Sequence, residues 1–270
     1  MHIQRGAWAE INLDAVAHNV QMAKANLKPT TKLCAVVKAD AYGHGAVRVA
    51  QEAARNGADF FAVALLQEGV KLREAGIETP ILVLGSMLPE VAEICVRYDI
   101  SHAVFDEERL YALNAAALKL HTKAKIHIKI DTGMHRIGVH VRDAGRFAKL
   151  AASLPGIYIE GVFSHFATAD ADDKQYAAYQ FERFQEALRL IEAEGVHIPI
   201  RHIANSAALT ELQEYQLDMV RQGITLYGLH PAHMIDCYKD FEPVMTVKTQ
   251  VAFVKTLPPG ETIGYGRTYT

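Results

Sequence analysis

Short apolar runs rich in β-branched residues alternate with longer segments of helical periodicity, and this alternation limits the folds open to the chain. Strands separated by helices pair in parallel through right-handed crossovers. Eight units in about 220 residues favour a closed (β/α)8 TIM barrel, of the α/β class, over an open doubly wound sheet. No G-x-G-x-x-G motif follows the first run, which argues against a dinucleotide-binding sheet. The eight predicted strands are Leu33–Val37, Phe60–Ala64, Ile81–Leu84, His102–Phe105, Lys125–Ile130, Ile157–Phe163, Ile200–Ala204 and Leu217–Val220.

The segments between these runs carry helix signals. Gly45–Arg55 has apolar residues at helical spacing, Asp106–Leu120 has an acidic first turn, and Tyr176–Ala193 is the longest predicted helix. An amphipathic segment, Leu13–Leu27, precedes the first strand, and Asp14 is its predicted N-cap.

The pattern changes towards the C-terminus. Pro243–Leu257 alternates apolar and polar residues, as a half-solvated antiparallel strand does, and Ile263–Thr270 begins another predicted strand. Trp8–Leu13 is also strand-like, and we expect it to pair with this region rather than with the barrel. The sequence therefore predicts a barrel over residues 11–240. Residues 1–10 and 241–270 would be strands of an incomplete β-rich C-terminal domain.

Composition and charge exclude several classes of function. The chain has 270 residues, 50% of them hydrophobic, and a net charge of −3 without clustered basic residues, so neither nucleic acid nor a membrane is an expected partner. It has no apolar signal segment and no apolar run of about 20 residues. Its three cysteines form no CxxC pair, which fits a reducing cytoplasm, and Cys34 is expected to be a buried structural thiol. No HExxH or other zinc motif, G-x-S-x-G motif or P-loop is present.

Polar residues follow five of the predicted strands, where a barrel carries its functional groups. A lysine directly after an apolar strand is partly desolvated, which favours a nucleophilic amine and suits a Schiff base. A serine at a helix start, with glycine and backbone N–H groups nearby, suits a phosphate, and arginines suit the oxygen and ring nitrogen of a pyridine cofactor. The residues concerned are Lys38, Asp131 with Arg136, His165, Asn205 with Ser206, and Arg221 with Gly223 and Ile224.

Each of these residues also has an ordinary interpretation. A strand-end lysine is often a solvated surface residue, His165 could be a hydrogen-bonded core histidine, and the arginines could be salt-bridge partners. Ser206 could simply cap the following helix. The conjunction of all of them on one predicted rim favours the functional interpretation.

Six segments resemble the alanine racemases, pyridoxal-phosphate enzymes with a barrel and a β domain. They occur in family order over essentially the whole chain, and the first and last are highly specific. They are AVVKADAYGHG at 35–45, KIDTGMHRIGV at 129–139, FSHFATAD at 163–170, ANSAA at 204–208, MVRQGITLYG at 219–228 and GETIGYGRTYT at 260–270.

The resemblance implies a role for each matching residue. Lys38 would carry pyridoxal 5′-phosphate as an aldimine and act as one base, and Tyr265 would act as the opposite base in the site of a partner subunit. Arg136 would bind the substrate carboxylate and the phenolic oxygen of the cofactor. Lys129 matches a lysine that is carbamylated in some members. The phosphate would be held by Tyr42, Ser206, Gly223 and Ile224, and the pyridine nitrogen would face Arg221, supported by His165.

The activity implied is the interconversion of L- and D-alanine through an external aldimine, supplying D-alanine for peptidoglycan, in a cytoplasmic homodimer. The family's second domain continues beyond residue 270, so we expect this chain to bind cofactor and to racemise alanine poorly without that domain. Two alternatives share a barrel of this type: a non-catalytic pyridoxal-phosphate homeostasis protein and an amino-acid decarboxylase. The strands after residue 240, Tyr265 and DTGMHRIG favour the racemase. A cofactor-free barrel scaffold is a third alternative.

Overall fold

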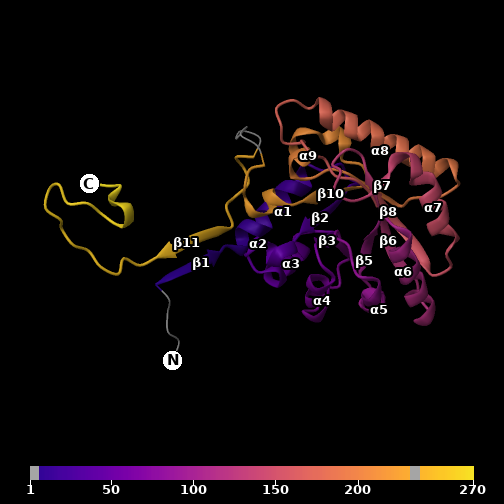
Figure 1. The fold of residues 1–270 in the computed structure, drawn as a ribbon, viewed down its shortest axis with the longest axis horizontal. Coiled ribbons are helices and arrows are strands. Elements are labelled where there is room, and N and C mark those ends of the chain that lie inside the picture. The colour runs from indigo at the N-terminus through magenta and orange to yellow at the C-terminus, as the bar shows by residue number, and fades with distance from the viewer. Residues whose placement is uncertain (1–5, 232–237) are drawn as a thin grey trace. The chain divides into compact units, whose positions relative to one another are not determined.

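A computed structural model describes residues 6–231 and 238–270, and the chain divides into two compact units (Figure 1). One unit is Asn12–Val244, and the other consists of Met1–Ile11 with Met245–Thr270. No helix in the described residues is long and apolar enough to cross a membrane.

The larger unit is the predicted (β/α)8 barrel. Its strands run parallel in the order β10-β2-β3-β4-β5-β6-β8-β9, with a short β7 beside β6. The ring closes between β9 and β10 through two backbone hydrogen bonds, Asp218 N to Arg201 O and Arg221 N to Ala204 O, both 3.1 Å long. The strands are β2 Lys32–Val36, β3 Phe60–Val63, β4 Ile81–Val83, β5 Ser101–Val104, β6 Ala124–Asp131, β7 Val139–His140, β8 Ile157–Phe163, β9 Ile200–His202 and β10 Met219–Gln222.

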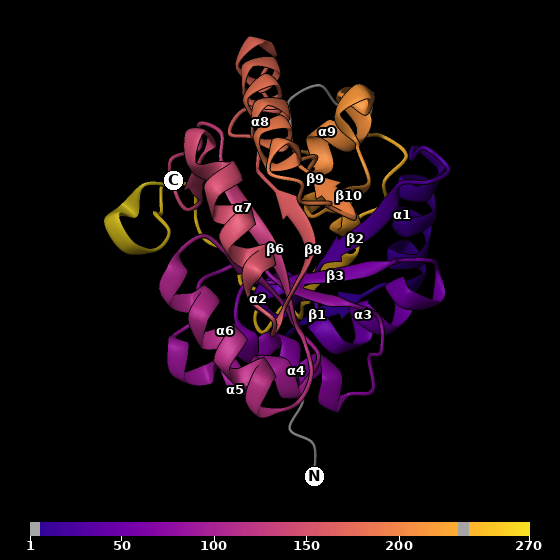
Figure 2. The same ribbon diagram turned by 90° about the vertical axis from the view of Figure 1, so that its right-hand side faces the viewer.

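Helices surround this ring (Figure 2). Their buried residues are mostly apolar. The predicted helices all form, with ends that differ by one or two residues from the predicted ones. The helices are α1 Leu13–Ala25, α2 Lys38–Tyr42, α3 Ala46–Arg55, α4 Leu66–Glu74, α5 Ala92–Arg97, α6 Glu107–Lys119, α7 Ala144–Ser153, α8 Gln175–Ala193 and α9 Ser206–Glu211.

The predicted N-cap Asp14 is wrong by two residues, and the alternative interpretation of Ser206 as an N-cap is wrong by one. Helix α1 is capped by Asn12, whose side-chain oxygen accepts from the N–H groups of Asp14 and Ala15, because Asn12 has an extended backbone whereas Asp14 already lies in the first turn. Helix α9 is capped by Asn205, which accepts from Ala208 N at 3.0 Å. The Ser206 hydroxyl is therefore available to other groups.

The eighth strand extends two residues further than predicted. Arg221 therefore lies within β10 instead of after it, and its side chain is directed by the strand. Cys34 is fully buried in β2 with a free thiol, as expected, and Cys95 is also a buried free thiol. Cys237 lies outside the described residues.

The smaller unit contains one short antiparallel pair. Strand β1, Ala7–Ile11, pairs with β11, Met245–Thr249, as expected for the N-terminal strand. The predicted strand Pro243–Leu257 is confirmed only over these five residues, because β1 offers no longer partner. The predicted strand Ile263–Thr270 is wrong. A 3₁₀ turn, Tyr265–Arg267, replaces it, because Gly264 and Gly266 adopt φ values of +71° and +73° that turn the chain back.

Candidate active site

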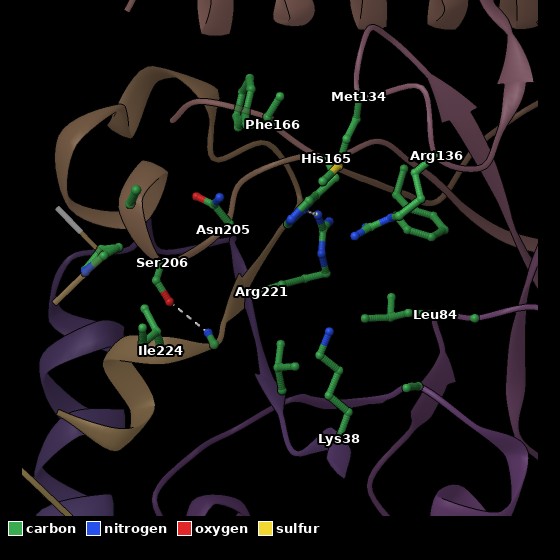
Figure 3. A pocket seen from close by; sticks show the side chains of 18 of the residues that line it. Lys38, Leu84, Met134, Arg136, His165, Phe166, Asn205, Ser206, Arg221 and Ile224 are labelled. Atoms are coloured by element: carbon green, nitrogen blue, oxygen red, sulfur yellow. Dashed lines mark hydrogen bonds between the residues drawn. The ribbon is translucent and has the colours of Figure 1, made fainter. Parts of the chain in front are cut away.

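A cavity of about 560 Å³ opens at the carboxyl ends of the barrel strands, within the usual size range of ligand pockets. Side chains from strand ends and from the loops and helices that follow the strands converge on it (Figure 3). Eight of the predicted site residues line it: Lys38, Tyr42, Arg136, His165, Ser206, Arg221, Gly223 and Ile224.

Lys38 enters the cavity from an uncommon backbone turn. The four residues that follow it, Ala39 to Tyr42, have φ values between +51° and +54°, so α2 is a left-handed turn made without glycine. Such a conformation costs roughly 1–2 kcal/mol per residue for an L-amino acid. Surrounding contacts must therefore hold it, and they fix the direction of Lys38.

Two carboxylates hold this turn. Glu68 accepts from Ala39 N at 2.5 Å, and its other oxygen accepts from the N–H groups of Ala64 and Leu65. Asp40 accepts from Ala46 N and from Lys71 Nζ, each at 3.1 Å. The turn is thereby fastened to both α3 and α4. Lys38 extends from it with its Nζ 5.9 Å from the centre of the Tyr42 ring.

Arg221 extends into the cavity from β10 and is only 3% exposed. Its guanidinium donates to His202 Nδ1 at 2.8 Å, to His165 Nδ1 at 2.9 Å and to two backbone carbonyls. No carboxylate in the described part of the chain forms an ion pair with it. Burial lowers the pKa of Arg221 to about 10, so the side chain remains a cation at neutral pH.

His165 and His202 are both acceptors towards this cation. Because arginine can only donate, the Nδ1 atom of each ring must carry a lone pair. Burial, followed by the nearby Arg221 charge, holds the pKa of both histidines well below the ordinary value. Both rings are therefore neutral.

Another wall of the cavity is formed by Ser206 together with Gly223 and Ile224, which begin the turn after β10. The Ser206 hydroxyl accepts from Gly223 N at 2.8 Å and from Thr225 N at 3.4 Å, so the N-cap interpretation is replaced by a bridge to this turn. Ser206 and Ile224 lie on the same side of the cavity, away from Arg136 (Figure 3).

Arg136 lies on the loop after β6, and Lys129 lies within that strand. Arg136 is exposed and lines the cavity, whereas Lys129 is 3% exposed and its Nζ donates to Ile130 O at 2.9 Å. Burial, with the adjacent Arg221 charge, lowers the pKa of Lys129 to about 7. The Asp131 carboxylate accepts from Gly133 N and His135 N and so shapes the loop that carries Arg136.

Tyr265 is not part of this cavity. It belongs to the smaller unit, in its 3₁₀ turn, and its side chain is fully exposed. Among the described residues, no group of three histidine, cysteine or acidic side chains could hold a metal ion.

The sequence interpretation missed the residues that support Lys38 and Arg221. Glu68 lies in a helical segment, where a carboxylate gives no distinctive signal, and the role of Asp40 depends on the left-handed turn that contains it. His127 could have been found, because KIHIKID at 125–131 places polar side chains at alternate positions of a buried strand. In a barrel such positions share the interior face.

The histidine environment generates a test at mildly acidic pH. We expect His165 and His202 to remain unprotonated from about pH 7.5 to 5.5, whereas unfolded histidines gain a proton near pH 6.5. Because the unfolded chain then binds more protons, the free energy of unfolding should fall as the pH drops below about 6.5. NMR spectra of the histidine rings in the folded protein, with the urea-unfolded chain as reference, measure the protonation of each ring. Urea unfolding at each pH measures the free energy of unfolding. Movement of either ring's resonances within that range would show the tautomer assignment to be wrong.

Comparisons with known proteins give one consistent result. The family profile "Alanine racemase, N-terminal domain" matches residues 11–231. An alanine racemase from Desulfovibrio desulfuricans is 46% identical over 98% of this chain and 71% of its own length. One from Halothermothrix orenii is 45% identical over 99% of this chain and 70% of its own length.

Solved structures agree with these relatives. An alanine racemase from Clostridium difficile 630 has a TM-score of 0.92 at 38% identity. The alignment covers 100% of this chain and 71% of that racemase. The alanine racemase of Bacillus anthracis, solved with bound L-Ala-P, has a TM-score of 0.91 at 36% identity. The alignment covers 100% of this chain and 70% of that racemase.

Proposed function

The chain belongs to the alanine racemase family, and on this premise we propose that it interconverts L- and D-alanine with pyridoxal 5′-phosphate bound at Lys38. One observation carries the proposal. A lysine, two arginines and a serine converge on a single cavity at the carboxyl end of the barrel (Figure 3). The Bacillus anthracis relative binds an alanine analogue, L-Ala-P, which supports alanine as the substrate.

The groups in the cavity fit this cofactor. Arg221 provides a buried donor that keeps its proton at neutral pH, which suits an unprotonated pyridine nitrogen, and its hydrogen bond to His165 steadies it. The Ser206 hydroxyl, Tyr42 and the backbone of Gly223 and Ile224 lie where a phosphate would be held. When bound, pyridoxal phosphate supplies an aldehyde that condenses with an amine and a ring that withdraws electrons from the substrate Cα.

Inversion at Cα requires proton exchange on two faces, and we assign these to Lys38 and Tyr265. Lys38 reaches the cavity from the turn that follows β2, and Arg136 on the loop after β6 would bind the substrate carboxylate. The full exposure of Tyr265 is consistent with a role in a partner's site, and we propose a homodimer.

The wider biology follows from the activity. We propose that residues 11–240 are the cofactor-binding domain, that 1–10 and 241–270 belong to a β-rich second domain, and that the protein supplies D-alanine for peptidoglycan in the cytoplasm. The buried free thiols Cys34 and Cys95 suit a reducing compartment. The matching family favours a racemase over the homeostasis protein and the decarboxylase.

Borohydride trapping tests the assignment of Lys38. Reduction of the protein with bound pyridoxal phosphate should label Lys38 in peptide maps. A Lys38→Ala variant should lose both the label and at least about 10³-fold in kcat for alanine racemisation, the contribution of a proton-transferring group. Lys123→Ala, which changes an exposed lysine, is the control. Label on another lysine, or racemisation by Lys38→Ala at the control rate, would refute the proposal.

Mixed dimers test the partner role of Tyr265. Lys38→Ala and Tyr265→Phe chains should each be nearly inactive. Random exchange of subunits makes half of the dimers mixed, and each mixed dimer has one intact site, so about a quarter of the normal activity should return. Activity that stays at the level of the separate variants would show that Tyr265 serves its own barrel.

Isotope labelling tests carbamylation of Lys129, which we propose on the basis of its surroundings. A pKa of about 7 leaves much of this amine neutral, and the neutral nitrogen can attack CO₂, forming an N–C bond and releasing one proton. The resulting anion would lie near the charges of Arg221 and Arg136, which also act on the amine. ¹³C-bicarbonate should give a carbamate resonance that disappears in Lys129→Ala. Its persistence in that variant would contradict the assignment.

A further inference from the structure

The barrel interior is divided into an apolar half and a polar half. The apolar half is formed mainly by β2, β3 and β4, with a cluster of buried residues: Cys34, Val36, Phe60, Ala62, Leu82, Ile200 and Met219. On the other side, β6, β8, β9 and β10 carry ionisable side chains into the interior. These side chains form a continuous chain of hydrogen bonds that reaches the candidate active site.

The chain of hydrogen bonds begins at Glu160 on β8. Its Oε2 lies 3.0 Å from His127 Nε2 and accepts from Ser101 Oγ at 2.5 Å. His127 Nδ1 lies 2.9 Å from His202 Nε2, and His202 Nδ1 lies 2.8 Å from Arg221 Nη1. Both histidines are fully buried, whereas the Glu160 side chain is 13% exposed. The network therefore leads from a partly exposed carboxylate to a buried guanidinium.

Hydrogen-bond chemistry gives this network one direction. Arg221 can only donate, so His202 accepts at Nδ1 and, being neutral, carries its proton on Nε2. That proton is donated to His127 Nδ1, which leaves the His127 proton on Nε2, facing Glu160. The carboxylate accepts it. If either ring adopted the other tautomer, two N–H groups would face each other somewhere along the network.

The strand geometry is shaped around this arrangement. The register of β6 and β8 shifts between Ile126 and His127, so that Ile126 pairs with Ile159 and His127 pairs with Gly161. Glu160 is the extra residue of this bulge, and a bulge re-aims a side chain. A Cβ at Gly161 would lie 2.5 Å from His127 Nδ1, so only glycine leaves room for the imidazole.

We propose that Glu160 is a positioning residue for Arg221. Acting through His127 and His202, it supplies the only carboxylate that the described hydrogen bonds link to this cation. By accepting the proton at the far end of the network, it stabilises the tautomers that the guanidinium requires. The consequence for cofactor binding rests on the proposed function, in which Arg221 faces the pyridine nitrogen. The tautomer consequence does not, because it concerns the chain's own residues.

Two substitutions at Glu160 separate its charge from its hydrogen-bonding role. Glu160→Gln keeps the size and an acceptor oxygen but removes the charge, and Glu160→Leu removes both. In the protein without cofactor, ¹⁵N NMR of the histidine rings should show His127 and His202 each protonated at Nε2. Glu160→Leu should shift the His127 nitrogens towards a mixture of tautomers, and Glu160→Gln should give a smaller shift because the neutral acceptor is weaker.

Binding of pyridoxal 5′-phosphate, followed by its visible absorbance, provides the second measurement. We expect the dissociation constant to rise about threefold in Glu160→Gln and about tenfold in Glu160→Leu, as expected when a hydrogen bond to a charged group is weakened or lost. Glu194→Gln is the matched control, because it changes a carboxylate paired with Lys149 at 2.6 Å on the barrel's outer helices. It should alter neither measurement.

The outcomes distinguish the two proposals. If the unmodified protein fails to bind pyridoxal phosphate, the proposed function fails, and the NMR spectra still decide the role of Glu160. If it binds the cofactor while Glu160→Gln leaves ring nitrogens and affinity unchanged, Glu160 has no positioning role, even where the variant is less stable. The glutamine variant preserves the packing, so it decides the matter if the leucine variant does not fold.

Discussion

A guanidinium buried inside the barrel without an adjacent carboxylate is the constraint on which the site depends. Arg221 is held by two imidazoles and two carbonyl oxygens, all of them neutral acceptors. Desolvating such a cation is unfavourable, and each neutral partner offsets only part of the cost. The polar half of the barrel interior follows from this constraint. His202, His127 and Glu160 extend the stabilisation over several strands, and the bulge on β8 makes room for them.

The same cation influences its neighbours. It helps to keep His165 and His202 neutral and to bring the pKa of Lys129 near neutrality. Arg221, Arg136 and Lys38 line the same pocket and give it a positive character, which suits a ligand with a phosphate and a carboxylate. Part of this positive character comes from Arg221, a buried side chain that is oriented by its strand.

Sequence patterns predicted the barrel well, because parallel strands covered on both faces are continuous apolar runs that stand out from amphipathic helices. The cavity residues were also foreseen, since strand ends converge in a barrel. The limits were local. Asn12 and Asn205, not Asp14 and Ser206, cap their helices, because adjacent polar residues compete for a cap and backbone angles decide between them. The segment after Ile263 has strand composition, yet two glycines with positive φ make it turn. The support from Glu160 was not visible, because it depends on a register shift between strands distant in sequence.

The left-handed turn after Lys38 has a consequence for redesign. Its four residues keep an unfavourable backbone with the help of two carboxylates: Glu68 accepts from the Ala39 N–H, and Asp40 accepts from Ala46 N at the start of the next helix. A lysine grafted onto the first strand of an unrelated barrel would not inherit this direction, since ordinary backbone preferences would return it to a right-handed turn or an extended loop. Transplanting the chemistry would require transplanting both carboxylates, with the helices that present them.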